Sequence, residues 1–354
     1  MTVKFLGNQS SFHLVTWKKL YGSLGIDIQE IGTIHQKLDN FEKQNLIGFQ
    51  FLPKILRYVI LGLYCLIRFT EKNVVFHAHG ASGYGLSALL SGRKYIVTVY
   101  GSEVLNPQNS QLYKLIVKLV LMRAYSITVT SSITKAYIVE HFKISEKKIH
   151  CFHTGIDTDQ LDELVIQQMG TPQVLDTAQI KFLSIRNSAS HYRTQEIVEA
   201  FLKLNNLDKQ THSLTLIQGN GDELYWNELK AKFGEYQNIH FLNGLINHDR
   251  FLNLIYTSDV CINFPKTDQL STTILEALYL KKKLISSDLD AYQELYSEKL
   301  QGVVTANNAE ELDQAFLKMS ITVEISNYHE KIKRDYLFTS AKGSLAKSIE
   351  GLLK

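Results

Sequence analysis

Two acidic residues eight positions apart, Asp268 and Glu276, have the types and the spacing to bind a polar ligand together. A strand-like run that ends at Phe264 precedes Asp268, and an apolar-periodic run that begins at Ile274 contains Glu276. Asp268 is therefore expected in a strand-to-helix loop and Glu276 inside the helix. The positive end of a helix attracts phosphate, and a carboxylate one turn further in can bind the two hydroxyls of a ribose. The alternative is an N-capped surface helix that carries two solvated acids.

Three small polar residues lie at the predicted helix start: Ser271, Thr272 and Thr273. Serine and threonine are favoured N-cap residues, and the first backbone N–H groups of a helix have no partner within the helix. These residues are thus expected to present amide groups to an anion such as a diphosphate.

The segment from Asp268 to Glu276 resembles the acidic–seven residues–acidic motif of retaining glycosyltransferases, in particular of glycosyltransferase family 4, with Asp268 where glutamate is more usual. The resemblance runs in order over almost the whole chain and is to the bacterial surface-polysaccharide type. It implies the α/β GT-B fold, in which two Rossmann-like domains face each other across a cleft. It also implies a nucleotide-diphosphate sugar as substrate, with Glu276 on the ribose, the 271–273 amides on the diphosphate and Asp268 beside the transferred sugar. No separate cofactor is expected, and a uridine diphosphate (UDP) sugar is the preferred donor.

Two histidines, His77 and His79, end a strand-like run and precede three glycines. Their spacing puts them on one face of the strand, so a metal pair is conceivable, but no third ligand stands nearby. In family 4 the second histidine of such a pair faces the transferred sugar, so the resemblance implies a catalytic His79. The alternative is a partly buried loop histidine.

A guanidinium at the end of another strand-like run, Arg186, is placed to stabilise the charge that develops on a departing diphosphate without a metal. In the family a lysine follows this arginine by some five residues and also contacts the diphosphate. Here His191, Tyr192 and Arg193 occupy that region. The resemblance therefore implies a catalytic Arg186, leaves Arg193 as a substitute for the lysine in donor binding, and makes Tyr192 a packing residue.

The turn that contains Gly219 and Gly221 follows a strand-like run and precedes a helix start. It fails as a dinucleotide fingerprint because Leu224 stands where a third small residue is expected. The alternative is a tight turn with no role in binding. The family lines its nucleotide pocket with this loop, so both glycines are predicted to lie beside the donor.

Strand-like and helix-like runs alternate along the chain, which is typical of parallel sheets with crossover helices. The length of 354 residues allows two domains with a core each. We expect an amino-terminal acceptor domain at 1–165, a linker at 166–178 and a donor-binding domain at 179–335, with a final helix at 336–354 that crosses back to the first domain. The predicted strands are 3–6, 73–77, 95–99, 126–130, 180–185, 214–217, 239–242, 260–264 and 283–286.

The composition is that of an ordinary globular protein, with 45% apolar and 21% charged residues. A formal net charge of +3 is too weak to indicate nucleic-acid binding. Cys65, Cys151 and Cys261 are scattered, which favours buried thiols in a reducing compartment over disulfides or a metal site. No signal peptide is visible, and the apolar run 58–67 is too short to span a bilayer. These features predict a cytoplasmic location and no bound metal.

Two stretches, 51–68 and 113–123, combine long apolar runs with lysine and arginine. They suit peripheral contact with the inner face of a plasma membrane and suit core-facing helices equally well. The predicted function is metal-independent, retaining transfer to a growing, lipid-linked bacterial surface glycan. The alternatives are a GT-B-type sugar-nucleotide epimerase or phosphorylase, and an inactive glycosyltransferase-like partner subunit.

Overall fold

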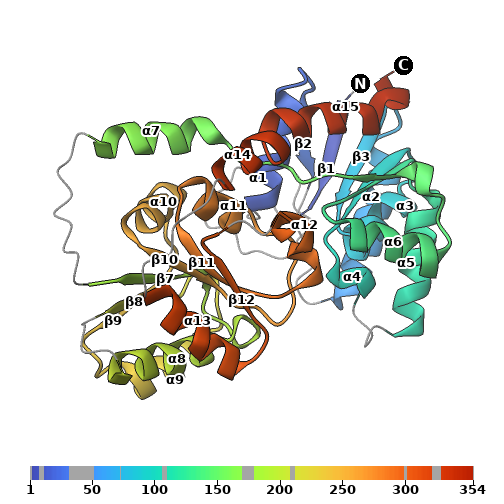
Figure 1. The fold of residues 1–354 in the computed structure, drawn as a ribbon. Coiled ribbons are helices and arrows are strands. Elements are labelled where there is room, and N and C mark those ends of the chain that lie inside the picture. Colours follow the sequence, from blue (N-terminus) through green and yellow to red (C-terminus); the bar gives the residue numbers. More distant parts are fainter. Residues whose placement is uncertain are drawn as a thin grey trace. The chain divides into compact units, whose positions relative to one another are not determined.

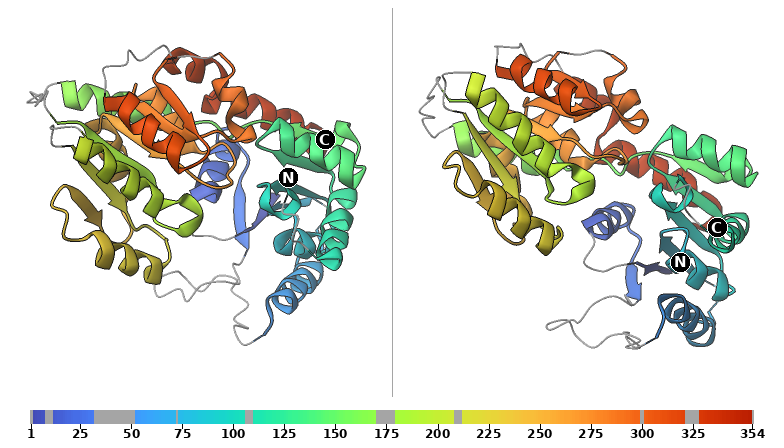
Figure 2. Two further views of the ribbon diagram at one scale, coloured as in Figure 1. Left: turned by 60° about the horizontal axis from the view of Figure 1, so that its bottom comes forward. Right: turned by 90° about the horizontal axis from the view of Figure 1, so that it is seen from below.

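The structure is a computed structural model of the chain, and it describes residues 2–7, 12–31, 52–71, 73–105, 110–169, 179–207, 212–298, 301–320 and 328–353. These residues form two compact units, residues 1–155 with 338–354 and residues 156–337. Each unit is a parallel sheet between two layers of helices (Figure 1), and the further views show the same layering within each unit (Figure 2). The predicted α/β class with two Rossmann-like domains is confirmed.

The boundaries of the two units differ from the predicted ones. Helix α7 (Thr158–Met169) packs on the second unit through Leu161 and Leu164, so the first unit ends at Gly155 rather than at residue 165. Residues 166–169 belong to this helix, and 170–178 lie outside the described residues. The carboxyl-terminal return to unit 1 begins at Phe338 rather than at residue 336.

The first unit contains a six-stranded parallel sheet in the order β2-β1-β3-β4-β5-β6. Its strands are β1 (Thr2–Leu6), β2 (Ile28–Ile31), β3 (Val74–His79), β4 (Tyr95–Val99), β5 (Ser126–Val129) and β6 (Ile149–Cys151). Its helices are α1 (Phe12–Gly22), α2 (Lys54–Arg68), α3 (Gly83–Leu90), α4 (Ser102–Leu105), α5 (Gln111–Arg123), α6 (Ser132–Phe142), η1 (Glu146–Lys148) and α15 (Phe338–Leu353).

Alternate residues of β3 separate the two faces of this sheet. Val74 and Phe76 join the core under α2, α3, α5 and α6, whereas Val75 joins the core under α1 and α15. Helix α15 reaches that second core with Ala341, Leu345, Ile349 and Leu352. The last helix of the chain therefore completes the core of the first unit.

The second unit contains a six-stranded parallel sheet in the order β12-β11-β10-β7-β8-β9. Its strands are β7 (Lys181–Asn187), β8 (Ser213–Ile217), β9 (Ile239–Leu242), β10 (Val260–Asn263), β11 (Lys283–Ser287) and β12 (Val303–Ala306). Besides α7, its helices are η2 (Ser190–Tyr192), α8 (Thr194–Leu207), α9 (Glu223–Phe233), α10 (His248–Thr257), α11 (Thr272–Tyr279), η3 (Asp290–Tyr292), α12 (Gln293–Tyr296), α13 (Ala309–Ser320) and α14 (Tyr328–Asp335).

Helices α8, α9 and α13 cover one face of this sheet, and α7, α10, α11 and α14 cover the other (Figure 1). Helix α11 is buried from Ile274 to Tyr279, which leaves the carboxylate of Glu276 inside an apolar layer. A fully buried glutamate is rare unless it has a partner or a function.

Two further features of the described residues bear on the predictions. None of their helices is long and apolar enough to cross a membrane. Cys65 and Cys261 are buried, but Cys151 is exposed, because β6 ends at the edge of its sheet. The prediction of a buried thiol was therefore wrong for Cys151.

Candidate active site

The predicted donor-site residues of the second unit follow the carboxyl ends of three strands. Arg186 is the second-last residue of β7, Gly219 and Gly221 follow β8, and Asp268 follows β10. Ligands of open parallel α/β sheets bind beyond these strand ends. The fold thus brings residues that are distant in sequence to one edge of one sheet.

Arg186 is the centre of a polar network at this edge. Its Nη1 donates to Ser271 Oγ at 2.6 Å, and its Nη2 donates to Tyr192 Oη at 2.6 Å. The same Nη2 lies 3.2 Å from Oδ2 of Asp268. The guanidinium carbon also lies 4.5 Å from the centre of the Tyr192 ring, a cation–π contact. Three elements therefore fix the direction of the Arg186 guanidinium.

Asp268 is held in turn by groups that donate to it. The hydroxyl of Tyr292 donates to Oδ2 at 2.9 Å, and the backbone N–H of Gln269 donates to Oδ1 at 2.9 Å. The amide of buried Asn263 donates to the Tyr292 hydroxyl at 2.9 Å. A chain of hydrogen bonds from the end of β10 therefore orients the carboxylate that pairs with Arg186.

The electrostatics of this pair keep Arg186 charged. Burial is the largest single influence and lowers the pKa of the guanidinium. The negative charge of Asp268, together with smaller contributions from Tyr192 and Tyr292, offsets burial and holds that pKa above its usual value. The two side chains are mostly buried, with 17% and 16% of their surfaces exposed. A charge so desolvated interacts strongly with any anion brought beside it.

The start of α11 adjoins this network. Ser271 is the N-cap residue, and its Oγ accepts from the backbone N–H of Thr273 at 3.3 Å. The hydroxyls of Ser271 and Thr273 are 2.7 Å apart. Thr272 is the first residue of the helix. The amide of Thr273 is thus used by the cap, and the Ser271 hydroxyl supports Arg186 as well as the helix.

Glu276 lies one turn into α11 and is 5% exposed. Its Oε1 is 3.3 Å from Nε2 of His248, the first residue of α10. Its Oε2 is buried and has no hydrogen-bond partner among the residues that the structure describes. Burial raises the pKa of this carboxyl to about 8. An unpaired buried carboxylate oxygen is costly, which makes Glu276 a candidate for contact with a ligand.

The two glycines after β8 permit close packing of two loops. A Cβ on Gly219 would lie 1.9 Å from Oδ1 of Asn187, and a Cβ on Gly221 would lie 2.1 Å from the carbonyl oxygen of Ser188. Gly219 also has a φ of +57°. Their observed role is to bring this turn against the end of β7, and their contact with a donor stays a prediction.

The region after Arg186 contains other groups in place of the expected lysine. Arg193 reaches the carboxyl ends of β10 and β12, where Nη1 donates to the carbonyl of Asn307 at 2.9 Å and the guanidinium lies 4.4 Å from the Phe264 ring centre. Burial, and then the charge of Arg186, lower the pKa of His191. In its neutral form His191 does not supply a second cation for a diphosphate. Arg193 could supply this cation only by giving up its hydrogen bond to Asn307.

The histidines of the first unit lie at the end of β3, with their rings stacked at 4.5 Å. His77 contacts the Tyr21 hydroxyl at 3.0 Å and the Thr98 hydroxyl at 2.7 Å, and burial lowers its pKa to about 3. Both ring nitrogens of His77 thus have protein partners, and the residue is a neutral core histidine rather than half of a metal pair. Among the described residues no group of three or more histidine, cysteine or acidic side chains is placed to hold a metal ion.

His79 is oriented by Tyr100, whose hydroxyl lies 2.9 Å from Nδ1. The Trp17 side chain hydrogen-bonds to the same hydroxyl, and an indole N–H can only donate. The hydrogen of the Tyr100 hydroxyl is then available to Nδ1 of His79, which favours the tautomer with the ring proton on Nε2. Such a ring presents a hydrogen-bond donor, the form required to stabilise an electron-rich oxygen.

Sequence reasoning missed Tyr292, Asn263 and His248, and it treated Tyr192 as packing only. Tyr192 lies only six residues after Arg186. A tyrosine hydroxyl so close in sequence to a candidate cation was the signal that could have identified it as a partner of Arg186. Asn263 is the second-last residue of the predicted strand 260–264, where a buried amide is unusual. Tyr292 and His248 reach the site from two separate helical elements, η3 and α10, and no spacing in the sequence connects them to Asp268 or Glu276.

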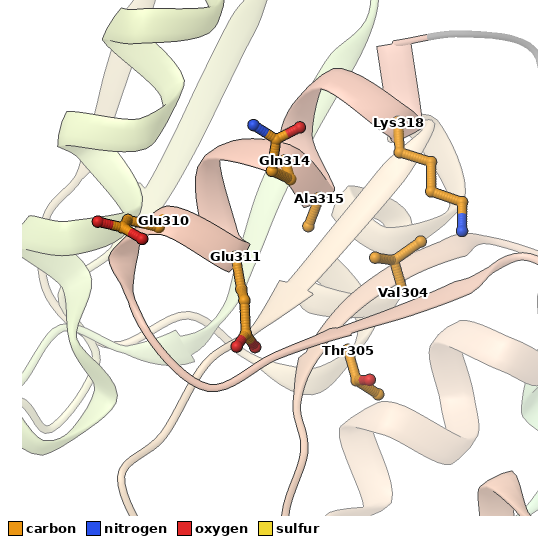
Figure 3. A pocket seen from close by; sticks show the side chains of 7 residues that line it. All are labelled: Val304, Thr305, Glu310, Glu311, Gln314, Ala315 and Lys318. Carbon is orange, nitrogen blue, oxygen red and sulfur yellow. The ribbon is translucent and has the colours of Figure 1, made fainter.

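A hollow of about 430 Å³ lies elsewhere on the second unit, against β12 and α13 (Figure 3). It is lined by Val304, Thr305, Glu310, Glu311, Gln314, Ala315 and Lys318. It contains none of the predicted site residues, and two glutamates against one lysine do not suit an anionic ligand. We therefore place the candidate site at the strand ends and not in this hollow.

Comparison with known proteins agrees with this architecture. The family model described as Glycosyltransferase Family 4 matches residues 29–160, and the model described as Glycosyl transferases group 1 matches residues 170–332. The uncharacterized glycosyltransferase MJ1069 of Methanocaldococcus jannaschii is 21% identical over 312 residues, which are 87% of this chain and 70% of that protein.

Three solved structures share the fold at low sequence identity. A glycosyltransferase from Rickettsia africae has a TM-score of 0.71 and 17% identity, covering 100% of this chain and 98% of the other. Sucrose-phosphate synthase from Thermosynechococcus elongatus has a TM-score of 0.72 and 14% identity, covering 100% and 99%. Anabaena Alr3699/HepE in complex with UDP and glucose has a TM-score of 0.70 and 13% identity, covering 99% and 100%.

The parallel sheets, the strand-end site and these matches together define the class: the chain is a glycosyltransferase with the GT-B fold. Its first unit corresponds to the family 4 model and most of its second unit to the group 1 model. The predicted enzyme class is thereby confirmed.

Proposed function

We propose that this chain is a retaining, metal-independent glycosyltransferase that moves a sugar from a nucleotide-diphosphate donor bound to its second unit. The proposal rests on two groups at helix α11. The oriented guanidinium of Arg186 contacts the N-cap residue of this helix, and Glu276, whose buried carboxyl group has an oxygen without a partner, lies one turn inside it. A positive group for phosphate and an acceptor for hydroxyls are thus about 7.5 Å apart along the helix, as five residues at a rise of about 1.5 Å each give. A nucleoside diphosphate offers both partners.

The chemistry that this arrangement supports is stabilisation of a leaving diphosphate. Departure of the nucleotide develops negative charge on the oxygen that leaves the sugar carbon, and Arg186 is already oriented and desolvated where that charge is proposed to form. The sugar carbon that loses the nucleotide develops positive charge, which the carboxylate of Asp268 is proposed to stabilise. The Nε2–H of His79 is proposed to donate to an oxygen of the transferred sugar. In a retaining reaction of this kind the leaving phosphate can itself take the proton of the acceptor hydroxyl.

A UDP-sugar is the proposed donor. The support is a fold-level likeness, since the Anabaena protein was solved with UDP and glucose and also with UDP-glucose. We further propose that Gly219, Gly221 and Arg193 lie beside the bound donor, with Arg193 turning from Asn307 when a diphosphate is present.

The test needs no knowledge of the acceptor, because water can replace it slowly. The protein is incubated with UDP-glucose, UDP-galactose or UDP-N-acetylglucosamine in EDTA, and the released sugar is read by early-time NMR. We expect release of UDP and of the sugar with the anomeric configuration of the donor. An inverted anomer or a strict requirement for Mn²⁺ contradicts the proposal, and an isomerised UDP-sugar indicates an epimerase instead.

The proposed acceptor is a growing, lipid-linked bacterial surface glycan, and an exposed apolar surface of the first unit supports it. Helices α2 and α5 both pack on α3. Large apolar side chains that are 42–77% exposed lie on their outer sides: Ile55, Leu56, Leu63, Leu66, Ile67, Leu112, Leu115, Leu119 and Met122. Neither helix contains an acidic residue, and each contains three basic ones. This combination suits an anionic bilayer and supports the proposal of a cytoplasmic enzyme that binds the inner face of the membrane.

Removing apolar surface from α5 is expected to release the protein from lipid. In Leu115→Glu/Leu119→Glu, two exposed leucines become acidic, so binding to phosphatidylglycerol vesicles should fall at least tenfold, since each nearby charge contributes about 1 kcal/mol. Co-sedimentation measures the change. Leu224→Glu, at a side chain 75% exposed on the second unit, is the matched control. Equal sedimentation of the double variant and the control would refute the membrane contact.

A further inference from the structure

Among the residues that the structure describes, His248 is the one whose polar side chain contacts the carboxyl group of Glu276. Its Nε2 lies 3.3 Å from Oε1 of Glu276, and 32% of the His248 side chain is exposed against 6% for Glu276. The histidine therefore stands between a buried acid and the surface at the strand-end edge. Neither the Asp268–Glu276 motif nor the arginine network includes it.

The position of His248 is fixed by the start of its own helix. It is the first residue of α10, and the side chain of Asn247 caps the helix by accepting from the backbone N–H of Arg250 at 2.9 Å. The ring of Phe251, one turn on, lies 6.4 Å from the imidazole in a stacked arrangement. Leu252 and Ile255, one and two turns on along the same side of α10, are buried in the core of the unit. The imidazole is thus presented to Glu276 from a packed, capped helix and not from a free loop.

We propose that His248 is a positioning residue that binds Oε1 of Glu276 and thereby turns Oε2 towards the two ribose hydroxyls of the nucleotide donor. The proposal rests on the proposed function, because it presupposes a donor ribose at Glu276. It extends that function by naming a residue on another helix that determines how strongly the ribose hydroxyls are recognised.

Glu276 needs a positioning residue because a carboxyl group in an apolar layer is unfavourable unless a polar partner holds it in place. Without His248 the described surroundings give neither oxygen of Glu276 a polar side-chain partner, and a carboxyl with a pKa of about 8 carries its proton at neutral pH. It can then rotate and donate as well as accept. An imidazole nitrogen beside Oε1 can accept a hydrogen bond from the carboxyl hydrogen and so keep that hydrogen on Oε1. Oε2 is then an acceptor in a fixed orientation. Two vicinal hydroxyls need such a fixed acceptor.

The test compares UDP with 2′,3′-dideoxy-UDP by titration calorimetry, since only the first has the hydroxyls that Glu276 would bind. We expect the wild type to prefer UDP by at least tenfold and Glu276→Ala to lose the preference. His248→Ala should reduce it to within threefold of Glu276→Ala, and His248→Gln, which keeps a side-chain hydrogen-bond acceptor at a similar reach, should recover most of it. His240→Ala, at an exposed histidine of the edge strand β9, should behave as the wild type.

The outcomes separate the two proposals. If His248→Ala keeps the wild-type preference while Glu276→Ala loses it, Glu276 binds ribose without help and the inference about His248 is wrong. If Glu276→Ala also keeps the preference, the ribose assignment of the proposed function fails and the inference fails with it. Melting temperatures of all variants show whether they are folded, and His248→Gln decides the matter should His248→Ala unfold.

Discussion

Replacing Arg186 with alanine is expected to lower kcat for UDP release by about 100- to 1000-fold, the usual effect of removing one pre-oriented charge-stabilising donor. The reason is geometric as well as electrostatic, because hydrogen bonds to Ser271 and Tyr192 hold the guanidinium in one direction. The effect should fall on kcat more than on KM, since the charge that Arg186 meets grows as the diphosphate leaves. Steady-state kinetics with a UDP-sugar provide the measurement.

The alanine variant also leaves Asp268 without its partner, so its fold must be checked by thermal unfolding. Arg186→Lys keeps a positive charge and avoids that loss, but lysine lacks the planar fork that reaches two acceptors at once. We therefore expect Arg186→Lys to melt near the wild type and still lose at least tenfold in kcat. Arg334→Ala removes a mostly exposed arginine of the same unit and should leave kcat unchanged. Wild-type turnover in both Arg186 variants would remove this residue from the mechanism.

Replacing Glu276 with alanine is expected to weaken binding of UDP by about 1–3 kcal/mol, roughly 5- to 150-fold, the usual cost of leaving buried hydrogen-bonding partners unsatisfied. The unpartnered Oε2 is the atom that would make this bond. Calorimetry with UDP measures the change, and Glu228→Ala, at an exposed glutamate of α9, is the control. Unchanged affinity in Glu276→Ala would exclude the residue from the donor site.

The same residue should leave a signature in the pH dependence of stability. Its pKa is about 8 in the folded protein against 4.5 ordinarily, so the folded state holds this proton more tightly than the unfolded state does. The favourable contribution of the neutral carboxyl is present below about pH 4.5 and is lost as the pH rises through about 8. Relative to the wild type, Glu276→Gln should therefore gain stability between those values, which thermal unfolding at pH 5 and pH 9 measures.

Most of the sheets could be predicted from the sequence, because central parallel strands are buried on both sides and read as short apolar runs. The strands that were missed are β2, β6 and β12, which all lie at sheet edges. An edge strand is half solvated and needs fewer apolar residues, as the run Ile-Gln-Glu-Ile of β2 illustrates. The predicted end of the first domain differs from the observed one because of α7. Its amphipathic pattern shows which face of the helix is buried, but not which of the two units the helix packs on.

The candidate site could be predicted only where strand ends or a helix start mark it. Arg186, Asp268 and Ser271 contact one another because a parallel sheet aligns its carboxyl ends, and that rule is available from the sequence. Tyr292 and His248 reach the same edge through the packing of α10, η3 and their neighbours. Such contacts depend on the angle and depth at which each element packs, and no local pattern encodes them.

A structure of the protein with bound UDP tests the central claim most directly. We expect the ribose hydroxyls to lie within hydrogen-bond distance of Glu276 Oε2, about 2.6–3.2 Å. We also expect a phosphate oxygen to lie within similar reach of the Arg186 guanidinium. UDP that lies away from both side chains, for example in the hollow against α13, would contradict it.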